Sequence, residues 1–146
     1  MKSVGDILDA KGDQQVFSIT PETIIQEAVQ LMAEKSVGSL VVLIDGRLVG
    51  IMTERDYTRK VMLKGLSSKT ARVGEIMSTT LITVDRKETM HRCMELMTNK
   101  RIRHLPVLEE GRVVGMLSIG DLMKHTIEDQ QEMIAKLEKY IRGEIS

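Results

Sequence analysis

The chain has 146 residues, and its 21 lysine and arginine residues balance its 21 aspartate and glutamate residues, so the formal net charge is zero. With 42% hydrophobic residues, the composition is that of a globular protein. The length fits one domain, or two very small halves that share a core. The zero charge and the scarcity of aromatic residues argue against a nucleic-acid-binding surface.

Other classes are excluded by local features. No stretch approaches the roughly 18 apolar residues that suggest a membrane span, and the first residues resemble neither a secretory signal nor a transit peptide. Cys93 is the only cysteine, so it can form neither an internal disulfide nor a thiolate metal cluster. We therefore expect a protein of the reduced cytoplasm, with no metal site, no membrane partner and no nucleic-acid partner.

An internal repeat organises the chain. Residues 16–58 align without a gap with residues 81–123, at an offset of 65. Eleven of the 43 pairs are identical, where chance would give about two or three. A further echo lies upstream, where the segment from Val4 to Ile7 matches the segment from Val73 to Ile76 at an offset of 69. The sequence therefore indicates a duplicated unit.

Both copies predict the same elements in the same order. A short strand (16–19 and 81–84) precedes a helix whose apolar residues recur at helical spacing, with Pro21 near its start in the first copy. Two β-branched strands follow (40–44 and 48–52; 105–108 and 113–117), joined by Asp45-Gly46 or Glu110-Gly111, which favour a tight hairpin. A second helix begins at Thr53 or Ser118, both favourable N-cap residues.

Two further segments complete the chain. Residues 63–72 are polar and predict a linker, and residues 127–141 predict another helix with an apolar side. One copy alone would leave a sheet face exposed. We therefore expect an α+β fold in which two strand-helix-strand-strand-helix repeats pack through their sheets with pseudo-twofold symmetry. The expected divisions are 1–65 for the first repeat, 66–127 for the second and 128–146 for a C-terminal amphipathic helix.

Three motifs carry a resemblance to a known family. They are Gly50-Ile-Met-Thr-Glu-Arg-Asp56, its counterpart Gly115-Met-Leu-Ser-Ile-Gly-Asp121, and Ile102-Arg-His-Leu-Pro-Val107. With them, residues 3–127 resemble a tandem pair of cystathionine-beta-synthase (CBS) domains, the Bateman module. The chain is most similar to small stand-alone pairs from bacteria and plant mitochondria. The first repeat departs from the third motif, because Val41 stands where the second repeat has Pro106.

The resemblance implies binding of adenosine ligands, with AMP first and ADP, ATP, NAD or S-adenosylmethionine as further candidates. The chemistry of the residues agrees. One carboxylate, Asp56 or Asp121, can accept two hydrogen bonds from a ribose cis-diol. Thr53 and Ser118 add a hydroxyl and a helix N-terminus that suit a phosphate. Three arginines are candidates for neutralising that phosphate: Arg55, Arg101 and Arg103.

The resemblance also implies how the rest of each pocket is built. Ile51 and Met116 would lie near the adenine, and Ser39 and His104 near the ribose or phosphate. The opening segment of the opposite repeat would complete each pocket, through Thr80 and Ile82 in one case and Val16 in the other.

Simpler roles are open for several of these residues. Asp56 and Asp121 can act as first-turn acids that stabilise helix dipoles, and Arg55 can form a solvated pair with Glu54. His104 can be a structural histidine. Cys93 lies on an apolar helical stripe and is expected in the core.

The expected function is that of a regulatory sensor of adenine nucleotides. We expect it to be non-catalytic, because the chain contains no P-loop, no H-E-x-x-H and no nucleophile elbow. No catalytic residue is assigned. One alternative is a structural or redox-linked adaptor whose clefts are vestigial, and another is a nucleotide-hydrolysing enzyme. We expect a homodimer that uses residues 127–141 among its contacts, and a regulated target protein whose identity the sequence does not give. The cleft around Thr53 and Asp56 is expected to bind AMP more strongly than the other.

Overall fold

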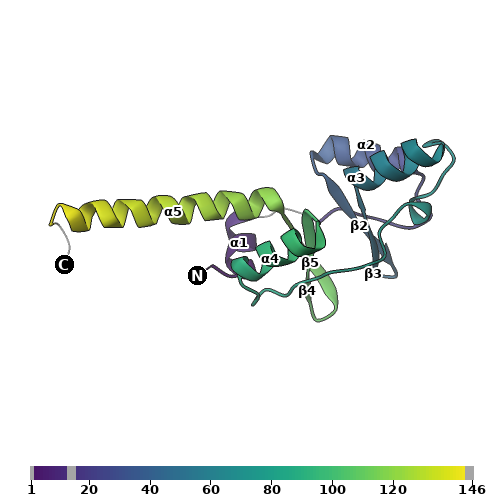
Figure 1. The fold of residues 1–146 in the computed structure, drawn as a ribbon. Helices are drawn as coiled ribbons and strands as arrows, with labels where there is room; N and C mark the ends of the chain where they lie inside the picture. Colours follow the sequence, from purple (N-terminus) through teal and green to yellow (C-terminus); the bar gives the residue numbers. More distant parts are fainter. Residues whose placement is uncertain (1, 13–15, 144–146) are drawn as a thin grey trace.

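Two small α+β units and one long helix make up the chain in a computed structural model, which describes residues 2–12 and 16–143. Residues 1 and 144–146, the outer ends of the expected first repeat and terminal helix, lie outside the described part. Figure 1 shows the elements in chain order: α1 (Val4–Lys11), β1 (Ser18–Ile19), α2 (Ile25–Lys35), β2 (Ser39–Ile44), β3 (Arg47–Thr53), α3 (Glu54–Asp56), the π-helical turn η1 (Tyr57–Met62), the 3-10 turn η2 (Val73–Glu75), α4 (Met90–Lys100), β4 (His104–Glu109), β5 (Arg112–Ser118) and α5 (Ile119–Ile141).

Each unit is built on a hairpin, as the repeat predicts. β2 pairs antiparallel with β3, and β4 pairs antiparallel with β5. Asp45 and Gly46 have φ values of 50° and 78°, and Glu110 and Gly111 have 51° and 78°. These left-handed conformations are those of a two-residue type I′ turn, which explains the glycines. β1 adds a parallel strand beside β2, and β3 contacts β5 between the two units.

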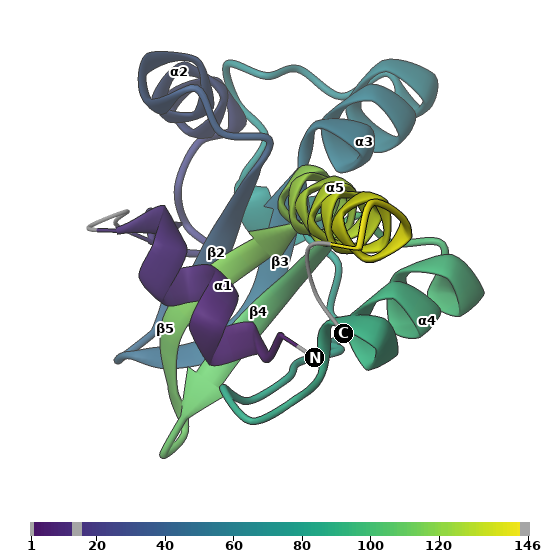
Figure 2. The same cartoon turned by 90° about the vertical axis from the view of Figure 1, so that its left-hand side faces the viewer.

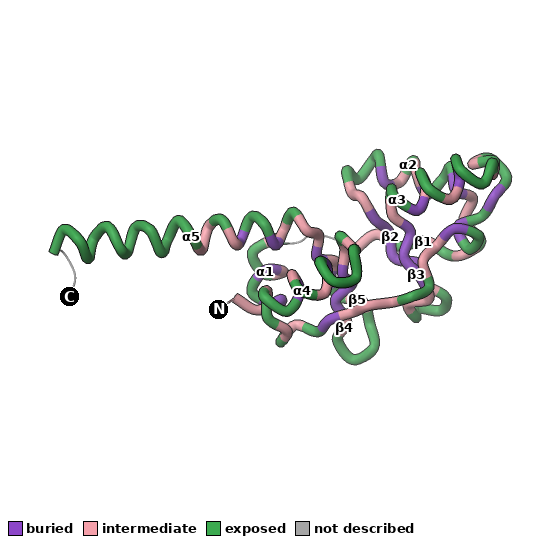
Figure 3. The backbone as a smooth tube through the Cα atoms, viewed as in Figure 1, coloured by how far each residue is buried: buried purple, intermediate pink, exposed green. Residues whose placement is uncertain are grey.

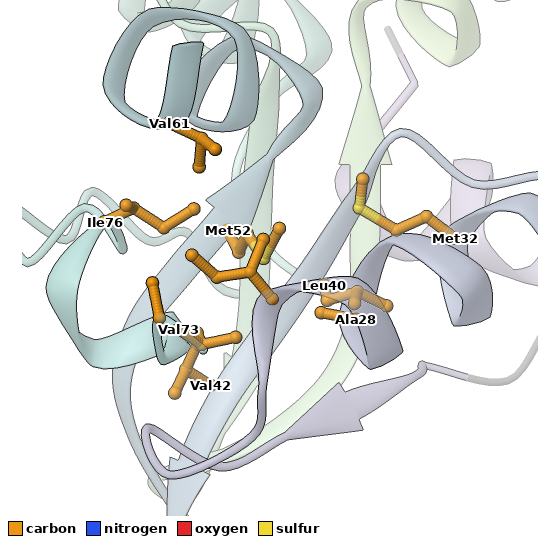
Figure 4. Packing of buried hydrophobic residues seen from close by; sticks show 10 residues of the cluster. Ala28, Met32, Leu40, Val42, Met52, Val61, Val73 and Ile76 are labelled. Carbon is orange, nitrogen blue, oxygen red and sulfur yellow. The ribbon is translucent and has the colours of Figure 1, made fainter. Parts of the chain in front are cut away.

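The two units exchange their opening segments. α1 packs in the second core, where Val4 and Ile7 are fully buried among residues of α4, β4, β5 and α5. Figure 2 shows α1 beside the β4–β5 hairpin. In return, Val73 and Ile76 are buried in the first core against residues of α2, β2 and β3 (Figure 4). The two hydrophobic cores therefore do not coincide with the two sequence repeats, because each core includes a segment from the other side of the expected division at residue 65.

Three local expectations differ from the structure. Residues 81–83 form no strand, and Val84 makes only an isolated parallel bridge to Val107. α2 begins four residues beyond Pro21, because residues 21–23 form a turn before its N-cap, Ile24. The polar linker ends in apolar packing, since Ala71 is buried in the first core.

The second helix of the second repeat and the expected terminal helix are one element, α5, of 23 residues. Its first turns bury Leu122 and His125, some neighbouring residues up to 129 are half-buried, and most of the remaining helix is exposed, as the tube in Figure 3 shows. The exposed part carries large apolar side chains: Ile127, Met133, Ile134, Leu137, Tyr140 and Ile141. Among the described residues, no helix has both the length and the apolar character needed to cross a bilayer.

Candidate functional site

Two helix starts with the same hydrogen bonds define the candidate sites. At α3, the backbone N–H of Asp56 donates to Thr53 Oγ1 at 3.1 Å, and the N–H of Thr53 donates to Asp56 Oδ2 at 3.0 Å. At α5, Asp121 N–H donates to Ser118 Oγ at 3.1 Å, and Ser118 N–H donates to Asp121 Oδ2 at 2.8 Å. These are reciprocal capping boxes. The expectation that Thr53 and Ser118 are N-caps is confirmed.

The first cleft, of about 540 Å³, opens at the start of α3. One wall comes from the first repeat and the opposite wall from residues 78–82 and 101–104 of the second. It brings together nine of the residues expected at a site: Ile51, Thr53, Arg55, Asp56, Thr80, Ile82, Arg101, Arg103 and His104.

The second cleft, of about 510 Å³, opens at the start of α5. Its opposite wall comes from α1 and from residues 16–17 and 36–39 of the first repeat. It brings together the remaining expected residues, with His104 shared: Val16, Ser39, His104, Met116, Ser118 and Asp121. Each cleft therefore lies between the repeats and uses the opening segment of the opposite one.

Asp56 is almost buried, with 7% of its surface exposed, and its carboxylate is heavily engaged. Besides the Thr53 N–H, Oδ2 accepts a hydrogen bond from Thr53 Oγ1 at 3.1 Å. Oδ1 accepts one from Ser78 Oγ at 3.0 Å and lies 3.4 Å from Lys60 Nζ. Ser78 is bound to the edge of β3 by backbone hydrogen bonds with Ile51. Asp56 therefore connects the start of α3 to the segment around Ser78, which comes from the second repeat.

Asp121 has a different partner, Lys11 of α1. Lys11 Nζ lies 2.8 Å from Asp121 Oδ2 and also donates to the backbone oxygen of Met116 at 3.0 Å. Burial alone would raise the pKa of Asp121, but the hydrogen bonds from Lys11 and from the cap residue Ser118 outweigh it and hold the pKa below its ordinary value. Asp121 therefore stays ionised at neutral pH.

His104 and Gly38 line both clefts and form the wall between them. Burial lowers the pKa of His104, against the opposing influence of Glu54 and Asp121. Lys11 and Arg103 lower it further. The imidazole is therefore neutral at pH 7, and it can offer one donor and one acceptor to either cleft.

Several polar residues that line the clefts were not singled out by the sequence, among them Lys60, Arg59, Ser78, Lys11 and Arg86. Lys60 and Arg59 follow Asp56 by four and three residues, so helical spacing alone places them beside it. Ser78 and Lys11 reach their clefts through the exchange of segments between the repeats, and Arg86 lies in the loop before α4, so none of the three has such a local signal. Arg103 lines the first cleft and not the second, where the cations of the lining are Lys11 and Arg86.

Comparisons with known proteins agree with this architecture. The CBS domain model matches residues 4–63 and 73–128. The chain is 39% identical over 149 residues to the mitochondrial CBS domain-containing protein CBSX3 of Arabidopsis thaliana, covering 97% of this chain and 72% of that protein.

Solved structures are similar as well. A putative signal-transduction protein with CBS domains from Burkholderia ambifaria is 45% identical, with a TM-score of 0.85 over 88% of this chain and 96% of that one. The CBS domain protein PAE2072 from Pyrobaculum aerophilum, complexed with AMP, is 27% identical, with a TM-score of 0.72 over 82% and 88%. The chain therefore belongs to the CBS domain family and carries two CBS domains, folded as a pair.

Proposed function

We propose that this protein is a non-catalytic regulatory module that binds adenine nucleotides of the AMP, ADP, ATP or NAD class in the clefts between its two CBS domains. One observation carries the proposal. In each cleft, a helix N-terminus, its hydroxyl cap and an aspartate line the same space as an apolar side chain of the same hairpin, Ile51 or Met116. An apolar side chain suits a base, and a hydroxyl, a carboxylate and a helix N-terminus beside it suit a ribose and a phosphate.

The similarity to the AMP complex of PAE2072 supports this class of ligand. We assign AMP as the first candidate, with S-adenosylmethionine as a further one. Binding would bias the angle between the repeats, and a target protein would respond to it. The free energy available for that change is the ligand's difference in affinity between the two states.

Isothermal titration calorimetry with AMP, ATP, NAD and S-adenosylmethionine tests the proposal, with GMP as the control for the base. We expect saturable binding of at least one adenine compound, and weaker binding of GMP. Incubation with ATP and Mg²⁺ should give no product. If none of the four compounds binds at millimolar concentration, or if ATP is hydrolysed, the proposal is wrong.

The redox-linked alternative needs a reactive thiol. Cys93 is the only cysteine in the sequence, it is fully buried in the second core, and burial raises its pKa to about 11. Thiolates, not thiols, carry out disulfide exchange. The burial of Cys93 therefore favours the nucleotide-binding proposal over thiol chemistry in this chain.

The proposal includes a homodimer in the cytoplasm. The exposed apolar side of α5, with Leu137 and Ile141 53% and 81% exposed, supports association because such a stripe gains free energy when it is covered. Sedimentation should give a dimer at micromolar concentration. Leu137→Glu should shift it toward the monomer, while Lys136→Glu on the same helix should not. A monomeric wild-type protein would contradict the dimer.

A further inference from the structure

The cations of the two clefts differ in whether they already have partners. In the part of the chain that the structure describes, no carboxylate lies within ion-pair distance of the four arginines of the first cleft, Arg55, Arg59, Arg101 and Arg103. The second cleft has two cations, and both are paired. Lys11 lies 2.8 Å from Asp121, and Arg86 lies 2.9 Å from Asp9. The first cleft therefore has an excess of positive charge, because these arginines have no carboxylate partner, and the second cleft is locally neutral.

The unpaired arginines continue outward from the first cleft. A neighbouring recess of about 540 Å³ shares all four of them and adds Lys100. Arg55 also donates to the backbone oxygen of Arg101 at 3.1 Å, so the start of α3 and the end of α4 are held together across this recess. An anion in the first cleft can therefore extend into this recess and still meet the same four arginines, as a chain of phosphates does.

The carboxylates differ in the opposite sense. Both oxygens of Asp56 are engaged by partners, namely Thr53, Ser78 and Lys60. On Asp121, the described residues engage only Oδ2, and Oδ1 receives no hydrogen bond from them. A carboxylate offers about four acceptor sites in all. Asp121 can therefore accept hydrogen bonds from a diol without giving up a partner, whereas Asp56 must exchange one.

From these two differences we infer that the clefts select ligands by phosphate content. The first cleft takes an adenine nucleoside di- or triphosphate and holds it chiefly by its phosphates, on Arg55, Arg59, Arg101 and Arg103. The second cleft takes an adenosine compound with few or no phosphates and holds it chiefly by its ribose, on Asp121. This inference rests on the proposed function, because it assigns a ligand class to each of the same two clefts.

Photo-crosslinking with 8-azido-ATP and 8-azidoadenosine, followed by peptide mapping, tests which cleft each ligand enters. We expect 8-azido-ATP to label peptides of the first cleft, such as residues 78–82, and 8-azidoadenosine to label α1 or residues 114–116. Inorganic tripolyphosphate should compete with the first probe only. Labelling of the same cleft by both probes, or equal competition against both, would overturn the inference.

Calorimetry on variants supplies the second test. In the wild type, we expect ATP to bind at least tenfold more tightly than AMP. Arg59→Gln with Arg103→Gln should remove most of that ratio, because neither side chain makes a hydrogen bond within the described residues and both face the cleft. Arg112→Gln, an exposed arginine at the start of β5 that lines neither cleft, is the matched control and should preserve the ratio.

The outcomes distinguish a failure of the selection by phosphate content from a failure of the proposed function. If AMP and adenosine bind but ATP binds no more tightly, or if the double arginine variant keeps the wild-type ratio, the selection by phosphate content is wrong and the proposed function stands. If no adenine compound binds at all, the proposed function fails, and the selection fails with it.

Discussion

Replacing Asp56 by alanine should lower the free energy of unfolding of the ligand-free protein by about 2–3 kcal/mol. Loss of the reciprocal cap at α3 costs about 1 kcal/mol. The Ser78 hydroxyl, which donates to Asp56 Oδ1 at 3.0 Å, loses its acceptor, at a cost of about 1 kcal/mol. The half-buried Lys60, 3.4 Å from the same oxygen, loses its counter-ion, which adds roughly 0.5 kcal/mol.

Thermal unfolding followed by circular dichroism measures this loss. For a chain of this length, the unfolding entropy is about 0.3 kcal/mol per kelvin, so the midpoint should fall by about 7–10 °C. Glu34→Ala is the matched control, because Glu34 is an exposed carboxylate on α2 with no ion pair or hydrogen bond among the described residues, and its midpoint should move by less than about 2 °C.

Asp56→Asn gives a further check. The amide oxygen of asparagine can still accept the cap hydrogen bond, so this variant should lose less than half as much stability as the alanine variant. A midpoint of Asp56→Ala within 2 °C of the wild type would refute the reasoning, because it would mean that the carboxylate does not fasten the helix start to residue 78.

Three further predictions concern other parts of the molecule. A Cβ added at Gly115 would lie 2.7 and 2.8 Å from the two methyl carbons of Leu8, so Gly115→Ala should destabilise the protein by about 1–3 kcal/mol. In a double-mutant cycle, adding Leu8→Ala should recover part of that loss, and simple additivity of the two changes in unfolding free energy would contradict the contact. Burial lowers the pKa of His104 in the folded state, so as the pH falls the unfolded chain binds the proton first. The contribution of neutral His104 to stability is therefore complete above pH 6.5 and is lost as the pH falls toward the lowered pKa. His104→Gln should flatten the fall in urea-unfolding free energy across that pH range, and an unchanged slope would rule this cause out. Cys93 should react with a thiol reagent at pH 8 only at the rate of unfolding, since it is fully buried and its pKa is about 11, and immediate labelling of the native protein would contradict this burial.

The parts of the fold that the sequence predicts correctly are those set by short-range chemistry. Asp45-Gly46 favours a tight turn whatever surrounds it, and the hairpin is there. Thr53 followed by an acid three residues later predicts a capped helix, and both copies of that pattern form capping boxes.

The parts that the sequence does not predict depend on which segments meet in space. The sequence pattern predicts no helix at residues 4–11, and the match of residues 4–7 to residues 73–76 does not indicate that Val4 joins the core of Val84 rather than that of Ile25. The same exchange carries Lys11 to Asp121, so the charge balance of the second cleft could not be read from the motif around it. Residues 81–83 fail as a strand for a local reason, since Pro106 has no N–H to donate to residue 82, whereas Val41 at the same position of the first repeat donates to Phe17.

The continuity of α5 connects the wall of the second cleft to the exposed end of the helix. The helix starts at Ser118, in the wall of that cleft, and runs for 23 residues without a break, which corresponds to a rod of about 34 Å. A tilt of about 5° at its capped end would therefore displace its far end by about 3 Å, roughly the length of one hydrogen bond. A displacement of that size is enough to take an interface out of register. If a ligand tilts the start of α5, the displacement is therefore largest at Tyr140 and Ile141, on its exposed tip.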